Sequence, residues 1–110
     1  MRKKIAALFS IAILLLSFSA DAQTDRKLRI LKKPHPKARK CSLSSGTALV
    51  RVTFHSTGTV TDTVLIQTSG CNSFDESSLN VARRIEFEPE IRNGTAVTVT
   101  KTVEYRFAIY

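Results

Sequence analysis

The two cysteines, Cys41 and Cys71, are the residues whose chemistry is easiest to specify. A pair of thiols can form a disulfide, stay free, or act in redox or metal chemistry. A zinc site needs four ligands at short range, and neither cysteine has a close histidine or cysteine neighbour in the chain. An exported protein meets oxidising conditions. If this chain is exported, the pair favours a structural disulfide, with two free thiols as the alternative.

The remaining polar residues do not form a recognisable catalytic set. His35 lies between two prolines, and His55 falls on the outer face of a predicted strand. No Ser-His-Asp order, HExxH motif or phosphate-binding loop accompanies them. Six acidic residues are typical of turns, helix caps and solvent-facing positions: Asp62, Asp75, Glu76, Glu86, Glu88 and Glu90. The sequence therefore predicts a protein that is not an enzyme and that needs no metal or cofactor.

Backbone hydrogen bonding is the third kind of chemistry that the sequence offers. Residues 95–110 alternate apolar and polar side chains, which is typical of a half-buried strand. Such a strand at the edge of a sheet has unpaired N–H and C=O groups that can bind a second chain. One face of it would carry Val97, Val99, Lys101, Val103, Tyr105, Phe107 and Ile109. Lys101 interrupts the apolar row, so we expect a β-bulge there or a core-facing row that begins only at Val103.

Residues 1–22 have the features of a secretory signal peptide. Three basic residues, Arg2, Lys3 and Lys4, precede an apolar run over residues 5–18, and Ala20-Asp21-Ala22 has the small-x-small pattern of a cleavage site. A helix over that run would be about 21 Å long, which is shorter than the roughly 30 Å hydrocarbon core of a bilayer. We expect cleavage before Gln23 and export; an uncleaved inner-membrane anchor is the alternative.

Residues 23–40 are predicted to form a flexible basic arm. The arm contains Arg26, Lys27, Arg29, Lys32, Lys33, Lys37, Arg39 and Lys40, opposed only by Asp25. Pro34 and Pro36 argue against regular structure, although the sequence is compatible with a short helix near residues 37–41. The charge could attract an anionic surface or simply keep the protein soluble. Export and the lack of aromatic residues in this part of the chain argue against nucleic acid as a partner.

A small domain is predicted over residues 41–110, and it begins with a β-hairpin. The first strand starts at Gly46, and residues 56–59 supply the turn. The row that should face the core in this strand is Ala48, Val50, Val52 and Phe54. Residues 60–68 should return as the second strand, with Val64 and Ile66 facing inward. Because the start of one strand lies beside the end of the other, Cys41 and Cys71 should come close together.

A helix and a last strand should complete the domain. Ser73 and Glu76 have the spacing of a capping box, and the helix should be about 12 residues long. Its buried face would contain Phe74, Ser78, Val81, Ala82 and Ile85. Asn93-Gly94 then predicts a tight turn. The order β-β-α-β predicts an α+β fold, in which one helix packs on a face of a three-stranded antiparallel sheet.

These motifs, in this order, resemble the C-terminal domain of TonB, the periplasmic domain of bacterial energy transducers. The resemblance covers residues 28–110. It rests on Lys33-Pro-x-Pro36, Ala38-Arg39, Gly46 with the alternating strand after it, Gly58-x-Val60, Ser69-Gly70, Ala82-Arg83, Phe87-x-Pro89 and Asn93-Gly94. It implies a periplasmic binding module that adds the TonB box, a short peptide of outer-membrane receptors, beside its last strand during energy-dependent transport.

Three departures from the family pattern limit this expectation. A full transducer has a membrane anchor and a long Pro-rich spacer, whereas this sequence offers a cleavable-looking leader and a short arm. The segment between Pro36 and Ala38 is contracted, and the cysteine pair is not part of the family pattern. We therefore expect an accessory protein of transport. The alternative is an envelope structural or assembly protein that uses its last strand to form homo- or hetero-oligomers, including a homodimer.

Overall fold

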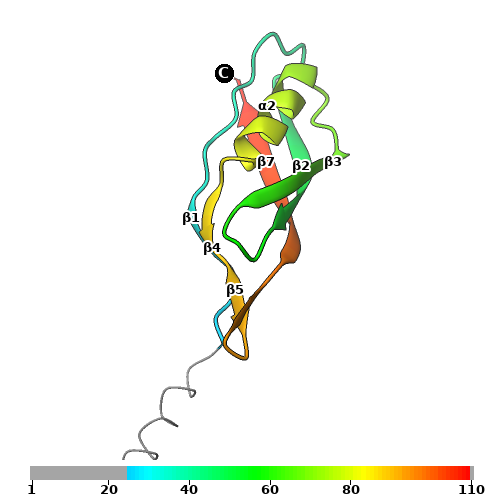
Figure 1. The fold of residues 1–110 in the computed structure, drawn as a ribbon. Coiled ribbons are helices and arrows are strands. Elements are labelled where there is room, and N and C mark those ends of the chain that lie inside the picture. The colour runs from blue at the N-terminus through cyan, green and yellow to red at the C-terminus, as the bar shows by residue number, and fades with distance from the viewer. Residues whose placement is uncertain (1–24, 110) are drawn as a thin grey trace, which may run out of the picture.

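The structure is a computed structural model that describes residues 25–109, so the predicted signal peptide lies outside the described residues. In chain order its elements are β1 (Arg29–Lys32), β2 (Ser45–Phe54), β3 (Val60–Gln67), α2 (Asn72–Ala82), β4 (Glu86–Glu88), β5 (Glu90–Arg92), β6 (Thr95–Val97) and β7 (Val99–Ala108). Helix α2 lies in front of a sheet made of β3, β2 and β7, and a slender end carries β5 (Figure 1). The predicted α+β fold is confirmed. Between residues 25 and 109, no helix is long and apolar enough to cross a membrane.

The central sheet has the strand order β3-β2-β7, and both pairings are antiparallel. The predicted inward row of β2 is confirmed, because Ala48, Val50, Val52 and Phe54 are all buried. Strand β7 pairs with β2 without irregularity, so no bulge occurs at Lys101, which is exposed opposite Val52. The alternative prediction fits better, since Tyr105 and Phe107 are buried and Val103 packs against the core. Val99 also packs there.

Strand β3 differs from its prediction because its register with β2 shifts twice. The shifts fall between Leu49 and Val50 and between Thr53 and Phe54 of β2, so a residue of β3 is left unpaired at each place. Each extra residue reverses the alternation of the side chains that follow. As a result Val64 and Ile66 are 42% and 47% exposed, whereas Leu65 packs against the core. The predicted inward row of this strand was wrong.

The predicted apolar face of α2 is confirmed, while the predicted cap is not. Its buried row consists of Phe74, Ser78, Val81 and Ala82, and Ile85 is buried just beyond the end of the helix. The N-cap residue is Cys71, without a side-chain cap hydrogen bond. Ser73 instead donates its hydroxyl to the backbone oxygen of Arg39. The capping box does not form because the helix begins at Asn72, so that Ser73 lies inside the first turn and not at the N-cap.

The basic arm is paired along the body of the domain rather than lacking regular structure throughout. Strand β1 pairs antiparallel with β4, with a register shift between Ile30 and Lys32. Arg26 and Ile91 exchange backbone hydrogen bonds of 2.9 and 2.7 Å farther along. Pro36 is buried, and Ala38 packs against the core. Within residues 25–71 the structure contains no helix, so the short helix considered near residues 37–41 does not form.

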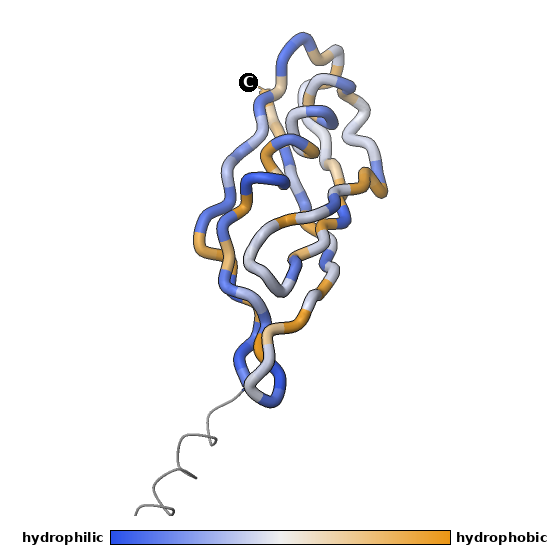
Figure 2. The backbone as a smooth tube through the Cα atoms, viewed as in Figure 1, coloured by the Kyte–Doolittle hydropathy of each residue, from blue (hydrophilic) through white to orange (hydrophobic). Residues whose placement is uncertain are grey.

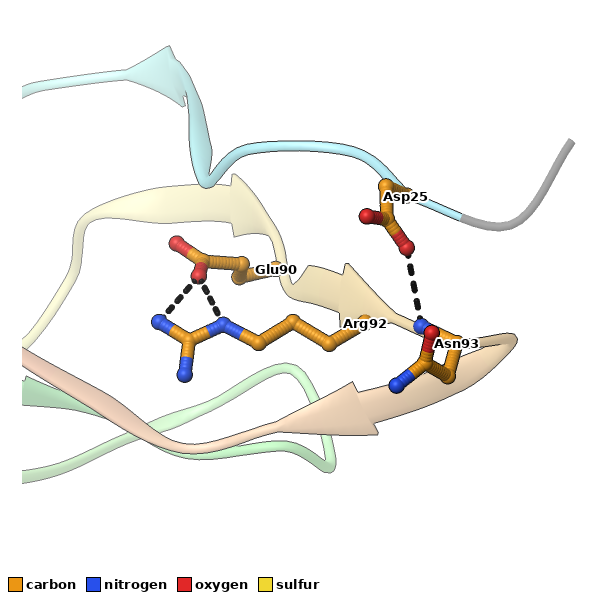
Figure 3. A network of polar contacts seen from close by, with 4 residues as sticks. All are labelled: Asp25, Glu90, Arg92 and Asn93. Atoms are coloured by element: carbon orange, nitrogen blue, oxygen red, sulfur yellow. Dashed lines mark hydrogen bonds and ion pairs between the residues drawn. The ribbon is translucent and has the colours of Figure 1, made fainter.

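The predicted tight turn at Asn93-Gly94 joins β5 to β6, and both residues have positive φ, of 52° and 79°. The turn is hydrophilic and lies at the slender end of the molecule (Figure 2). There the carboxylate of Asp25 accepts a hydrogen bond of 2.8 Å from the backbone N–H of Asn93 (Figure 3). Beside it, Arg92 forms an ion pair of 2.6 Å with Glu90. This end is thus held to the arm by polar contacts.

The strand predicted over residues 95–110 is divided into β6 and β7 at Thr98. The hydroxyl oxygen of Thr98 accepts a hydrogen bond of 3.0 Å from the backbone N–H of Ser56, in the β2–β3 turn. Strand β6 pairs with β5, whereas β7 pairs with β2. The break lets one long segment, which exceeds the usual length of a strand, take part in two sheets.

Candidate functional site

The candidate site is the edge of β7 that does not face β2. Strand β7 is the last strand of the three-stranded sheet, and ten consecutive residues of it pair with β2 in one register. An edge strand of this length presents a row of backbone N–H and C=O groups to a partner. The geometry of the edge therefore depends on which residues direct those groups outward.

Two hydrogen bonds define the direction of the backbone groups of β7. The N–H of Ile109 donates to the oxygen of Ser44 (2.7 Å), so odd-numbered residues point their backbone groups toward β2. The side chain of Lys33 donates to the backbone oxygen of Glu104 (3.2 Å), which must therefore point the other way. Antiparallel pairing alternates these directions along a strand. The outward groups thus belong to Thr100, Thr102, Glu104, Arg106 and Ala108.

The residues predicted for peptide pairing lie in the expected segment but point their backbone groups inward. Five of them, Val99, Lys101, Val103, Tyr105 and Phe107, are the odd-numbered residues of β7. Val97 belongs to β6, and Ile109 follows the end of β7. The prediction selected the apolar row because it is conspicuous. In β7 the alternate, even-numbered row carries the free backbone groups, and only the pairing with β2 shows which row that is.

Lys33 is the contact at this edge that sequence reasoning missed. Its ammonium group lies 4.8 Å from the centre of the Tyr105 aromatic ring and donates to the oxygen of Glu104. The carboxylate of Glu104 itself pairs with Arg106 on the same strand, at 3.0 Å. The edge thus combines exposed backbone acceptors with a cation that comes from a segment 71 residues away in the chain. Only the docking of the arm brings these groups together.

The disulfide between Cys41 and Cys71 fixes the arm on which Lys33 lies. The predicted bond is confirmed, with 30 residues of separation and Cα atoms 5.3 Å apart. It joins the end of the arm to the N-terminus of α2. Two further contacts support the same segment: the backbone N–H of Lys37 donates to Ser77 Oγ (2.9 Å), and that of Arg39 donates to Ser73 Oγ (3.3 Å). The arm is therefore held against the helix beside the β7 edge.

Burial changes the acidity of Tyr105, whose side chain underlies this edge. Tyr105 is only 2% exposed, and its hydroxyl has no hydrogen-bond partner among the described residues. Burial raises the pKa of Tyr105 to about 12 because the charged phenolate would lose its solvation. Tyr105 is therefore neutral at physiological pH, and it acts as an apolar support for the edge rather than as an acid or base.

Asp75 ties the far end of β3 to the helix. It is 6% exposed, and its carboxylate accepts hydrogen bonds from the hydroxyl of Thr68 and from the backbone N–H and hydroxyl of Ser69, the last two at 2.9 and 2.7 Å. Burial raises the pKa of Asp75, but these hydrogen bonds outweigh burial and hold the pKa below its ordinary value. Each partner is a hydroxyl or amide in a loop, so the contact is structural.

No other arrangement in the described residues suggests chemistry. Among residues 25–109, no group of three or more histidine, cysteine or acidic residues could hold a metal ion. A hollow of about 410 Å³ lies at one end of β7, where its lining residues are Ser45, Gly46, Thr47, Arg106, Phe107 and Ala108. These residues come from the paired ends of β2 and β7, so the hollow spans both strands.

Comparison with protein families gives a match that covers residues 32–109 and is described as the C-terminal region of the Gram-negative bacterial TonB protein. A search of curated proteins found no match. The matched range begins within β1 and includes the disulfide, α2 and the whole of β7. It therefore spans all of the features that build the candidate edge.

Proposed function

This chain belongs to the TonB C-terminal family, and from that premise we propose that it binds an extended peptide of an outer-membrane receptor as an added strand beside β7. The family consists of non-enzymatic protein-interaction domains that are associated with energy coupling to transport and that interact with outer-membrane receptors. The protein accordingly belongs to the bacterial envelope. The finer assignments, to the periplasm after signal cleavage and to an accessory role in transport, are part of the proposal.

The observation that carries the proposal is the regularity of the β7 edge. Ten residues keep one register against β2, so outward backbone groups recur at every second residue from Thr100 to Ala108. An extended peptide can bind all of them with its own backbone, and this requires little of its side chains. Such binding would extend the sheet from three strands to four.

The bound peptide would also meet side chains on both sides of the edge. Glu104 and Arg106 lie on the outer face of the sheet, where they form an ion pair, and Lys101 lies exposed on the face toward α2. These groups surround the backbone row but do not block it. The backbone would supply most of the affinity and the surrounding charges would adjust it.

Titration of the ¹⁵N-labelled protein with a TonB-box peptide, followed by amide chemical shifts, tests the proposal. We expect the largest shifts at Thr100, Thr102 and Glu104, whose N–H groups point outward. Amides of β3 serve as the internal control and should change little. A monomeric protein whose β7 amides do not respond to the peptide, or whose β3 amides respond more strongly, would contradict the proposal.

The same free edge supports a second candidate function, which is pairing of β7 with β7 of another copy in an envelope assembly. Two antiparallel copies would satisfy the same outward groups, and an open edge is a template for this contact. Sedimentation over a range of protein concentrations distinguishes the two candidates. A monomer at all concentrations with peptide-dependent shifts supports receptor binding. A dimer whose dissociation exposes the β7 amides to solvent exchange supports assembly.

A further inference from the structure

Lys33 occupies one of the positions that a strand added to β7 would have to use. Its ammonium group donates to the backbone oxygen of Glu104 at 3.2 Å, where a peptide N–H would otherwise donate. The same group lies over the face of Tyr105, at 4.8 Å from the centre of the aromatic ring. Lysine side chains at sheet edges protect them against unintended pairing. Lys33 therefore covers part of the edge in the absence of a partner.

The arm keeps Lys33 in this place. Pro36, three residues farther along, is buried, and Lys37 and Arg39 are hydrogen-bonded through their backbone to the helix. The disulfide between Cys41 and Cys71 attaches the end of the arm covalently to the N-terminus of α2. With the arm attached, the backbone near Lys33 stays beside β7 when its side chain moves. A peptide that takes the oxygen of Glu104 would thus displace the ammonium group only by a side-chain rotation.

Water can solvate the displaced ammonium group, but a carboxylate close to the edge would attract it as well. Glu104 cannot supply one fully, since its carboxylate already pairs with Arg106 at 3.0 Å. Lys101 is exposed on the α2 side of the edge, but its charge already has an acidic neighbour: the pKa of Glu90 is lowered by its hydrogen bond to Arg92 and also by the charge of Lys101. Lys33 is thus the cation at this edge for which a carboxylate of the bound peptide would be a new partner.

We propose that Lys33 is a specificity-determining residue of the β7 edge. It favours peptides with an acidic side chain next to the peptide residue that pairs with Glu104. Paired residues of adjacent strands share a face, so the peptide residue opposite Glu104 points to the outer face. Its chain neighbours point to the α2 side, where Lys33 and Tyr105 lie. A carboxylate at one of these neighbours can take up the ammonium group that the peptide backbone displaces. This inference rests on the proposed strand addition.

A peptide scan tests the inference with the full-length chain, purified in whichever processed form the cell produces. The probes are nine-residue, end-capped peptides based on one TonB box, with glutamate placed at each position in turn and a matching set with glutamine. For the wild-type protein we expect one position, or two positions flanking the residue opposite Glu104, at which glutamate binds about fivefold tighter than glutamine. In Lys33→Gln this preference should disappear, and the glutamine peptides should bind as well as before or slightly better.

Two charge-matched variants control for net charge and for the neighbouring lysine. Lys37→Gln removes a charge from the same arm, and Lys101→Gln removes one from the edge itself; both should keep the glutamate preference. A preference that persists in Lys33→Gln, or that is lost in Lys101→Gln instead, would overturn the assignment to Lys33. Equal binding of the glutamate and glutamine sets by the wild-type protein would overturn it as well, while leaving strand addition intact. If no peptide binds, strand addition itself is wrong, and the inference falls with it.

Discussion

The two edges of the central sheet differ in regularity, although both belong to strands that pair with β2. Strand β3 shifts its register twice within eight residues and carries the exposed charge of Asp62. Strand β7 keeps one register over ten residues. Bulges and charges protect an edge from pairing, and a long regular edge invites it. The comparison shows that backbone irregularity protects the β3 edge of this small domain from pairing, whereas the β7 edge stays available for a further strand.

The available edge is protected in a different and reversible way. Irregularities of β3 are part of its backbone and persist whatever binds. At β7 the protection comes from the Lys33 side chain, which makes one hydrogen bond to the strand and can rotate away. A permanent block suits an edge that should never pair, whereas a displaceable side chain suits an edge that pairs with selected partners.

Among the changes that test this comparison, Gly46→Ala is expected to have the largest effect on stability. A Cβ atom at Gly46 would lie 2.8 Å from the Phe107 ring and too close to the backbone oxygen of Ser69, so it would press on β7 and on the segment after β3 together. We expect a loss of up to about 3 kcal/mol in the free energy of unfolding, measured by urea denaturation. Gly58→Ala is the contrasting variant, because a Cβ there meets nothing within 4 Å and only the positive φ of 97° opposes it. A Gly46→Ala protein as stable as Gly58→Ala would contradict this account of the packing.

The second effect concerns the end of β3 and depends on pH. The folded-state pKa of Asp75 is lowered, so the stabilisation is fully present above the unfolded-state pKa and is lost as the pH falls through the folded-state pKa. Asp75→Asn should therefore cost about 2 kcal/mol of unfolding free energy at neutral pH. It should cost much less in strong acid, where the wild-type carboxylate is protonated too. Denaturation curves for both proteins across acidic pH test this, and a pH-independent difference would show that charge on Asp75 is not the cause. Peptide binding at β7 should be unaffected.

The smallest expected effect separates the two edges directly. In Thr102→Pro the outward N–H is removed from β7, while the ladder to β2 is kept, because Thr102 directs its backbone groups away from β2. We expect peptide affinity to fall about tenfold, with a modest loss of stability. Thr63→Pro applies the same change to β3, whose edge should not bind peptide, and should leave affinity near the wild-type value. Calorimetric titration of both variants compares the edges, and an equal loss in each would show that binding does not depend on which edge is altered.

Much of the fold could be predicted because the residues that face the core follow strict alternation on a regular strand and helical spacing on a regular helix. The inward row of β2 and the buried face of α2 are such cases, and the Asn93-Gly94 turn and the disulfide follow from equally local chemistry. Strand β3 could not be predicted in detail, since a bulge reverses the alternation without a distinctive residue at either site. The predicted helix cap was wrong for another reason: the helix begins at Asn72, and Ser73, inside its first turn, bonds to Arg39 of a distant segment.

The candidate site could be predicted only in part, because its geometry depends on contacts between distant segments. Alternation identified the strand, but the direction of its backbone groups depends on its pairing with β2, which sequence did not supply. Lys33 was read as one charge of a flexible arm. Its contact with Glu104 depends on how β1 pairs with β4 and how the arm reaches the helix, and both are tertiary arrangements.

The disulfide also gives the two edges different covalent topology. The bond between Cys41 and Cys71 closes a macrocycle that contains all of β2 and β3, whereas β7 lies outside it. When the domain opens, the β2–β3 hairpin stays tethered at its ends by the disulfide, whereas only hydrogen bonds and side-chain packing hold β7 to β2. The strand proposed to accept a partner is thus also the strand that lies outside the covalent cross-link, while the protected edge stays locked within the macrocycle.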